Sequence, residues 1–447
     1  MNISKLVSFK YSRVLKLDRN RKLSIGVASG IFIKAMALVF TLISVPMTLH
    51  YLGVERYGVW VTMISMLAWI SLVDIGVANG LTPLLTSAFG KGRIDLAKGY
   101  VATAFWSLTI SSVVTGIVIF AIWSWIDWSR LFNIKSHELE SQISTAMALA
   151  VGIFLVNLPI SINQRIYLAS QNGAIANAWQ FFSSLAGIVG IYLATKTQGG
   201  LVYLVLGYSG AQFLVGLVNT IWLFGWAKPE LRPFVWPKFI DAKSVMAMGG
   251  MFFLNQIATL IIFQKDNILI SHYLGPVQAT HYSVMWQIFF YFNTINLLIA
   301  PYLGPAFGEA HAKKDLNWMR IAASRYLFVT FGIAFLGVTF LFIFYKQILT
   351  LWVGPDVLPE RGTVIWMALW TMVLSVQWPI ISLLNSTGRI RVFTLFYIFA
   401  AVLNIFLSVA LIKAVGVTGG LIASVLTMTA IVLLPSAREL LHIVKGR

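Results

Sequence analysis

The chain has 447 residues, of which 58% are hydrophobic and only 11% are charged. Soluble proteins are roughly a quarter charged, so this composition excludes a string of soluble domains and indicates a membrane protein. Cysteine is absent, which excludes disulfides, thiolate metal sites and a cysteine nucleophile. The net charge of +18 comes from short basic segments between apolar runs, where such residues orient a protein in a bilayer rather than bind nucleic acid.

A basic segment opens the chain. Residues 1–24 hold seven Lys and Arg, and their apolar residues can share one helical stripe, the pattern of a helix resting on anionic headgroups. We expect a cytoplasmic or interfacial segment here.

Twelve apolar runs follow, each able to supply the about 20 residues that a transmembrane helix needs. We predict spans at 25–49, 57–82, 100–125, 144–168, 176–196, 201–225, 245–272, 279–304, 322–348, 363–384, 393–413 and 418–436. No connection is long enough for a soluble domain, and there is no phosphate-binding loop of the nucleotide hydrolases. The predicted fold class is an all-α polytopic membrane protein.

The distribution of basic residues predicts the orientation. Of the 33 Lys and Arg, 24 fall in the segments that share a side with both termini, and seven fall on the other side. Because basic loops stay in the cytoplasm, we expect both termini there, in the inner membrane of a bacterial cell. The even number of spans requires the same arrangement.

The chain also repeats itself at an interval of about 220 residues. Four motifs recur in order: His50–Gly53 as His272–Gly275, Pro83–Gly90 as Pro301–Gly308, Pro159–Ile160 as Pro379–Ile380, and Gly199–Leu201 as Gly419–Leu421. The repeated unit has six spans, an even number, so the two copies are parallel. We therefore expect two six-helix lobes, 25–227 and 228–447, that face one another across a cleft and rock in alternating access.

Charged residues inside the first lobe are candidate binding groups. A buried charge in a bilayer is costly unless it is paired or hydrated. Lys34 and Asp74 fall at similar depths of spans 1 and 2, so they can form either a salt bridge between helices or a charged wall of the cavity. Arg165, near the cytoplasmic end of span 4, fits a snorkelling arginine better than a cavity residue.

In the second lobe, Lys265 and Asp266 are neighbours in span 7. Consecutive helical residues point about 100° apart, so we expect them not to pair and at least one to meet another partner, water or substrate. The six His form no metal-ligand set, and no Ser/His/Asp arrangement stands out. We expect a transporter without metal or cofactor, not an enzyme.

Three segments resemble the polysaccharide-transporter branch of the multidrug/oligosaccharidyl-lipid/polysaccharide exporter superfamily. They are Tyr51–Trp60 (YLGVERYGVW), Asp74–Gly80 (DIGVANG), and the stretch of spans 7 and 8 that contains Asp266–Ile270, Leu274–Gly275 and Tyr282. The resemblance implies a V-shaped pair of lobes around a cation-lined cavity, in which Lys34, Lys265 and Arg165 are candidate residues. It also implies an oligosaccharide flippase.

Such a flippase moves an undecaprenyl-diphosphate-linked oligosaccharide to the periplasmic leaflet for O-antigen, capsule or exopolysaccharide assembly. A polysaccharide polymerase and a chain-length regulator are candidate partners, and H⁺ or Na⁺ is a candidate coupling ion. The first alternative is a cation-coupled multidrug antiporter of the same superfamily, for which only Asp74 and Asp266 offer embedded carboxylates. A membrane-embedded polymerase is a weaker alternative, because no long external loop carries an acidic metal-binding pair.

Overall fold

The computed structural model describes residues 3–134, 137–236, 239–388 and 390–446. These residues are helical almost throughout and include no strand, which confirms the all-α class. A helix satisfies its backbone N–H and C=O groups internally, the condition for crossing hydrocarbon. Two compact units are formed: unit 1 comprises Met1–Met47, Ser71–Ile126 and Ser144–Phe253, and unit 2 comprises Thr48–Ile70, Asp127–Ile143 and Leu254–Arg447.

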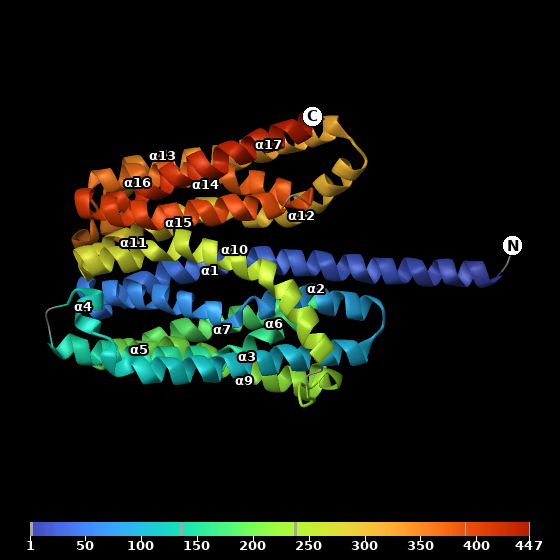
Figure 1. Cartoon of the computed structure of the whole chain (residues 1–447), viewed down its shortest axis with the longest axis horizontal. Helices are drawn as coiled ribbons and strands as arrows, with labels where there is room; N and C mark the ends of the chain where they lie inside the picture. The colour runs from blue at the N-terminus through green and yellow to red at the C-terminus, as the bar shows by residue number, and fades with distance from the viewer. Residues whose placement is uncertain (1–2, 135–136, 237–238, 389, 447) are drawn as a thin grey trace. The chain divides into compact units, whose positions relative to one another are not determined.

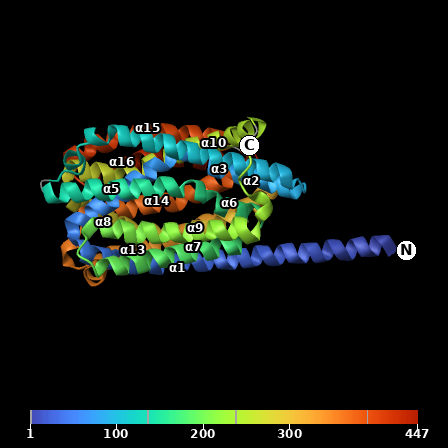
Figure 2. The ribbon, with the colours of Figure 1, turned by 90° about the horizontal axis from the view of Figure 1, so that it is seen from below.

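Unit 1 is a bundle in which α7 and α9 run side by side (Figures 1 and 2). Its complete helices are α2 (Val77–Gly90), α3 (Ile94–Ile122), α6 (Ile162–Ala169), α7 (Gly173–Thr195), α8 (Gly200–Val205) and α9 (Ala211–Trp222). It also contains the first part of α1 (Ile3–Ile70), most of α5 (His137–Asn157) and the start of α10 (Phe239–Leu274).

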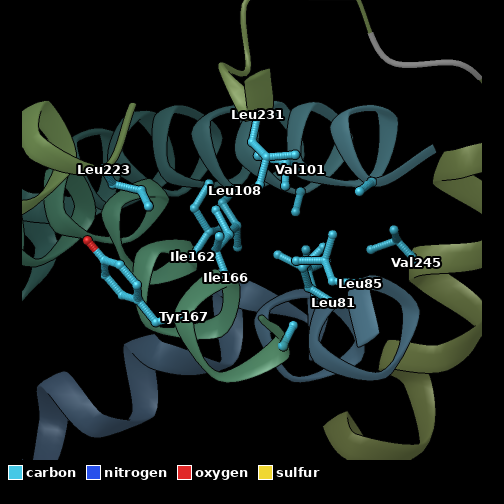
Figure 3. Packing of buried hydrophobic residues seen from close by; sticks show 14 of the residues in the cluster. Leu81, Leu85, Val101, Leu108, Ile162, Ile166, Tyr167, Leu223, Leu231 and Val245 are labelled. Atoms are coloured by element: carbon cyan, nitrogen blue, oxygen red, sulfur yellow. The ribbon is translucent and has the colours of Figure 1, made fainter. Parts of the chain in front are cut away.

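The core of unit 1 joins three helices. Leu81 and Leu85 of α2, Leu108 of α3, and Ile162 and Ile166 of α6 are all fully buried in one cluster (Figure 3). Lipid tails are as apolar as leucine, so in a membrane such a core stabilises the unit through close packing rather than through removal from water. This packing fixes the orientation of α6, which carries the candidate residue Arg165.

Unit 2 contains the remaining helices, with α13 beside α14 and α15 beside α16. They are α4 (Trp128–Phe132), α11 (Pro276–Phe290), α12 (Ile295–Ala312), α13 (Leu316–Val353), α14 (Arg361–Ser386), α15 (Ile390–Val415), α16 (Thr418–Thr427) and α17 (Leu434–Lys445). A second core there includes Phe307, Met319 and Leu383, all fully buried.

The repeated motif takes the same backbone conformation in both copies. Gly53 has φ 75° and ψ 169°, and Gly275 has φ 91° and ψ 164°. This region of the backbone map is open essentially to glycine alone. Farther along, a 3₁₀ turn interrupts the helix at Ser71–Asp74 in the first copy and at Tyr291–Asn293 in the second. The two copies therefore share both a helix reversal and a break within the following span.

Nine helices among the described residues are long and apolar enough to cross a membrane. One of them, Ala28–Asp74, has 47 residues, about twice the length needed for one crossing, and it breaks at Gly53, so it covers the first two predicted spans. Predicted span 7 lies in α10, and span 8 is divided between α11 and α12. The helices thus accommodate all twelve predicted spans.

Candidate functional site

Asp74 occupies the break in the second predicted span. Its side chain is 9% exposed, and one carboxylate oxygen, Oδ1, accepts a hydrogen bond of 2.6 Å from the backbone N–H of Gly76. Ile75 and Gly76 have φ of 48° and 72°, which turns the chain before α2 begins. The carboxylate therefore stabilises a non-helical turn in the span. Non-helical backbone at membrane depth occurs where it is buried in protein or lines a cavity.

The cationic residue that interacts with Asp74 is Arg165. The two side chains interact electrostatically, and Arg165 is half-buried on α6. The sequence favoured an arginine that snorkels to the membrane surface, whereas the structure places Arg165 in the lining of a polar cavity. Lys34 has an exposed side chain on α1, and its pairing with Asp74 stays a prediction.

The cavity lies wholly within unit 1 and has a volume of about 380 Å³. Its walls come from the end of α5, the turn Pro159–Ser161, α6, α7 and α9. Most of the side chains in the lining are polar: Asn157, Ser161, Asn163, Gln164, Arg165, Tyr167, Trp179, Gln180, Ser183, Ser184, Gln212 and Asn219. Of the described residues in this lining, Arg165 is the one that is charged, and none is a carboxylate.

Sequence reasoning found the side of this cavity formed by span 4 and missed the sides formed by spans 5 and 6. On α7, Trp179, Gln180, Ser183 and Ser184 recur at the three-to-four-residue spacing that places side chains on one helical face. On α9, Gln212 and Asn219 are two turns apart. A search for polar residues at helical spacing within apolar spans could have found both faces.

In unit 2, Lys265 and Asp266 form an ion pair, and our prediction that they do not pair is wrong. The Lys265 Nζ lies 2.5 Å from Asp266 Oδ1, and both side chains are 3% exposed. Adjacent side chains leave a helix in different directions, but the four-carbon lysine chain is flexible enough to bring its ammonium back to the neighbouring carboxylate.

Our prediction of a further partner is confirmed, because the pair belongs to a buried network. The Tyr282 hydroxyl donates a 3.0 Å hydrogen bond to Asp266 Oδ2, and Lys265 Nζ lies 3.5 Å from the Ser424 hydroxyl oxygen. Asn404 donates to Ser424 and, at 2.8 Å, to Thr427. The network thus connects α10, α11, α15 and α16, and it satisfies charges that would be very costly alone in hydrocarbon.

Gly420 on α16 allows this approach. A Cβ at this position would lie 2.9 Å from Asp266 Oδ1, closer than a side chain can stand without displacing the carboxylate. Within the part of the chain that the structure describes, no three His, Cys, Asp or Glu side chains are grouped so that they could hold a metal ion. The structure therefore offers two polar centres, one in each unit.

Comparisons with known proteins agree with this architecture. The model of the family described as polysaccharide biosynthesis protein matches residues 21–311, and the model of the MatE family matches residues 252–410. A Salmonella typhi protein named as a candidate O-antigen transporter is 23% identical over 335 residues, which cover 74% of this chain and 75% of the relative.

Two solved structures share the fold. An inward-facing multidrug resistance transporter of the MATE family, in the MOP superfamily, aligns with a TM-score of 0.78 at 16% identity, covering 94% of this chain and 99% of that one. The lipid II flippase MurJ aligns with a TM-score of 0.67 at 12% identity, covering 94% and 90%. The family model spans more than half of the chain, and the chain belongs to the polysaccharide biosynthesis protein family, with the fold of the MOP superfamily.

Proposed function

We propose that this protein is a flippase that moves an undecaprenyl-diphosphate-linked oligosaccharide from the cytoplasmic to the periplasmic leaflet of the bacterial inner membrane. Both termini lie in the cytoplasm, and the two repeats, 25–227 and 228–447, are the moving parts of an alternating-access cycle. The product serves surface polysaccharide assembly, with a polymerase and a chain-length regulator as functional partners. Relatives named for O-antigen transport support this reading.

One observation favours a lipid-linked anion over a cationic drug. One of the two carboxylates that the sequence places within spans, Asp266, has a cationic partner at 2.5 Å in Lys265. The other, Asp74, has only an electrostatic interaction with Arg165. A compensated carboxylate has little attraction left for a cationic ligand. With Lys34 included, the embedded charges have an excess of one cation, which suits a diphosphate.

The alternative is the multidrug antiporter, to which the MatE match over residues 252–410 and the MATE neighbour point. That match covers a smaller part of the chain than the polysaccharide biosynthesis match over residues 21–311. The ion pair at Asp266 also weakens it, because a drug-for-cation exchanger needs an embedded carboxylate that can change its protonation or its partner.

The test is translocation by the purified full chain in liposomes. Undecaprenyl-diphosphate-linked oligosaccharide with a fluorescent label on the sugar is placed in both leaflets, and a membrane-impermeant reductant bleaches the label outside. We expect the protein to expose the inner pool to bleaching, while protein-free liposomes keep it protected. Imposed H⁺ or Na⁺ gradients, which accelerate the exchange if they are coupled to it, identify the ion. Accumulation of ethidium driven by a gradient, without movement of the labelled lipid, would instead establish the antiporter.

A further inference from the structure

The polar cavity of unit 1 is dominated by side-chain amides. Six of the residues in its lining are carboxamides: Asn157, Asn163, Gln164, Gln180, Gln212 and Asn219. Each carboxamide offers two donor hydrogens and an acceptor oxygen. Such a group can serve a hydroxyl in both of its hydrogen-bonding roles at once.

Some of these amides belong to the framework of the cavity. Asn163 donates a 2.7 Å hydrogen bond to the Thr220 hydroxyl, and the Tyr167 hydroxyl donates a 2.8 Å hydrogen bond to Asn219. Both bonds tie α6 to α9. The carbonyl oxygen Oδ1 of Asn163 is buried and has no hydrogen-bond partner among the described residues.

Other amides are available to a ligand. Asn157, Gln180 and Gln212 line the cavity, and none of them hydrogen-bonds to a residue that the structure describes. Asn157 and Gln180 are exposed and Gln212 is half-buried. Their amides are therefore open to water or to a polar ligand in the cavity.

Two glycines leave the room that two of these amides occupy. A Cβ at Gly216 would lie 3.3 Å from Asn157 Oδ1, and a Cβ at Gly187 would lie 2.7 Å from Gln212 Nε2. A larger residue at Gly187 would push the Gln212 amide out of its position. The helices thus approach one another closely beside Asn157 and Gln212, which line the cavity.

The charge of the cavity argues against an ion as its ligand. Among the described residues of the lining, Arg165 supplies the only formal charge, and Asp74, which is not one of them, interacts with it. A diphosphate attracts several cationic groups, and a cationic drug needs a carboxylate, which these described residues do not include. Unpaired amides, serines and the indole of Trp179 suit the hydroxyls and the apolar face of an uncharged sugar ring.

Unit 2 also contains a cavity. It has a volume of about 250 Å³, and its lining includes Asn255, Trp378 and Asn385. Asn385 follows Arg165 by the interval of the repeat, and it lies on α14 where Arg165 lies on α6. One position of the repeat thus lines a cavity in both units, although the walls differ: the described lining of the unit 2 cavity comes from α10, α14 and α15, and α9 of unit 1 has no counterpart in it.

We propose that the unit 1 cavity binds an uncharged sugar residue of the lipid-linked oligosaccharide, at a site separate from the one that takes the diphosphate. This inference rests on the proposed function and adds to it a specificity for the sugar. The hydroxyls of the ring replace water on Asn157, Gln180 and Gln212, and Trp179 offers an aromatic face. Gln180 of α7 and Gln212 of α9 thereby contribute to recognition of the sugar.

Equilibrium binding to the full chain in nanodiscs tests the proposal with two probes that share the lipid and the diphosphate. One is undecaprenyl diphosphate, and the other is the same lipid carrying N-acetylglucosamine, an uncharged sugar. The variants are Gln180→Leu and Gln212→Leu, and the matched control is Gln198→Leu, an exposed glutamine outside the cavity. Thermal unfolding of each variant checks the fold, and Gln212→Met replaces Gln212→Leu if the latter is unstable.

We expect each cavity variant to weaken binding of the sugar-bearing lipid about threefold to tenfold, the loss of one uncharged hydrogen bond. Binding of undecaprenyl diphosphate should be unchanged, and the control should bind both lipids as the wild type does. Equal weakening of both probes, or no change in either, would overturn the proposal. Wild-type protein that binds neither probe would overturn the proposed function itself, so the two failures are distinguishable.

Discussion

Lys265 and Asp266 are consecutive residues of one helix, yet their side chains meet at 2.5 Å in the interior of unit 2, where each is 3% exposed. The pair also contacts the Tyr282 and Ser424 hydroxyls of two other helices. This ion pair carries no net charge into the membrane. Removal of either partner would leave the other charge uncompensated.

The first prediction concerns that pair. Lys265→Met should destabilise the protein by about 3–5 kcal/mol, because it leaves the buried Asp266 carboxylate without its counter-ion. The double variant Lys265→Met with Asp266→Asn should recover much of that loss, since no charge is then left unpaired. Thermal unfolding in nanodiscs measures both. A double variant no more stable than Lys265→Met would show that the unpaired charge of Asp266 is not what destabilises the single variant.

The second prediction concerns a close helix contact in unit 2. A Cβ at Gly58 would collide with the backbone carbonyl of Pro276, and the Thr280 hydroxyl donates a 2.6 Å hydrogen bond to the Val54 carbonyl beside it. Gly58→Ala should therefore separate these helices and cost about 1–3 kcal/mol of stability, as overpacking does.

Gly332→Ala is the matched control for Gly58→Ala. Gly332 lies inside α13, and a Cβ there has nothing within 4 Å. Alanine should be tolerated at Gly332 in the same unfolding measurement. Equal stability of the two alanine variants would contradict the close contact at Gly58.

The third prediction separates the charge of Asp74 from its hydrogen bond. Asp74 accepts the Gly76 N–H at 2.6 Å, and an asparagine oxygen can accept the same bond. Asp74→Asn should therefore retain more thermal stability than Asp74→Ala, which removes the acceptor from the unwound segment. If both variants unfold at the same temperature, the interaction of the carboxylate with Arg165, and not the turn, is what stabilises this segment.

The fourth prediction concerns Lys34. If its ammonium meets the diphosphate, Lys34→Arg should keep most polysaccharide export because the charge remains, whereas Lys34→Ala should lose it while the protein stays in the membrane. Export is measured in cells that lack the wild-type gene, at matched and limiting protein levels. Normal export by the alanine variant would remove Lys34 from the site.

The fifth prediction concerns orientation. The chain has no cysteine, so single cysteines can be labelled without background. Gln198→Cys and Asp356→Cys should react with an impermeant maleimide in intact spheroplasts, and Glu230→Cys and Lys314→Cys should react only after the membrane is permeabilised. All four positions are exposed. Reaction of Glu230→Cys in intact spheroplasts would refute the twelve-span orientation.

Features that depend on local sequence were predictable. Apolar runs predict helices because a bilayer offers the backbone no other hydrogen-bond partners. The repeated His-Tyr-Leu-Gly motif marked the two places, Gly53 and Gly275, where the backbone takes a conformation that glycine alone adopts readily. The embedded charges were found for a related reason, since each is conspicuous in an apolar run.

The partners of those charges were decided by the tertiary structure. Arg165 interacts electrostatically with Asp74, and Lys265 pairs with its own neighbour, because long flexible side chains reach toward the charges that the packing brings near them. The amide-lined cavity likewise depends on how α6, α7 and α9 turn toward one another. The sequence alone determined that this chain is an all-helical, duplicated membrane protein with charges inside its spans, because hydropathy and repeats are local properties. Only the packing of the helices decided which polar faces share a cavity, because that packing joins residues far apart in the chain.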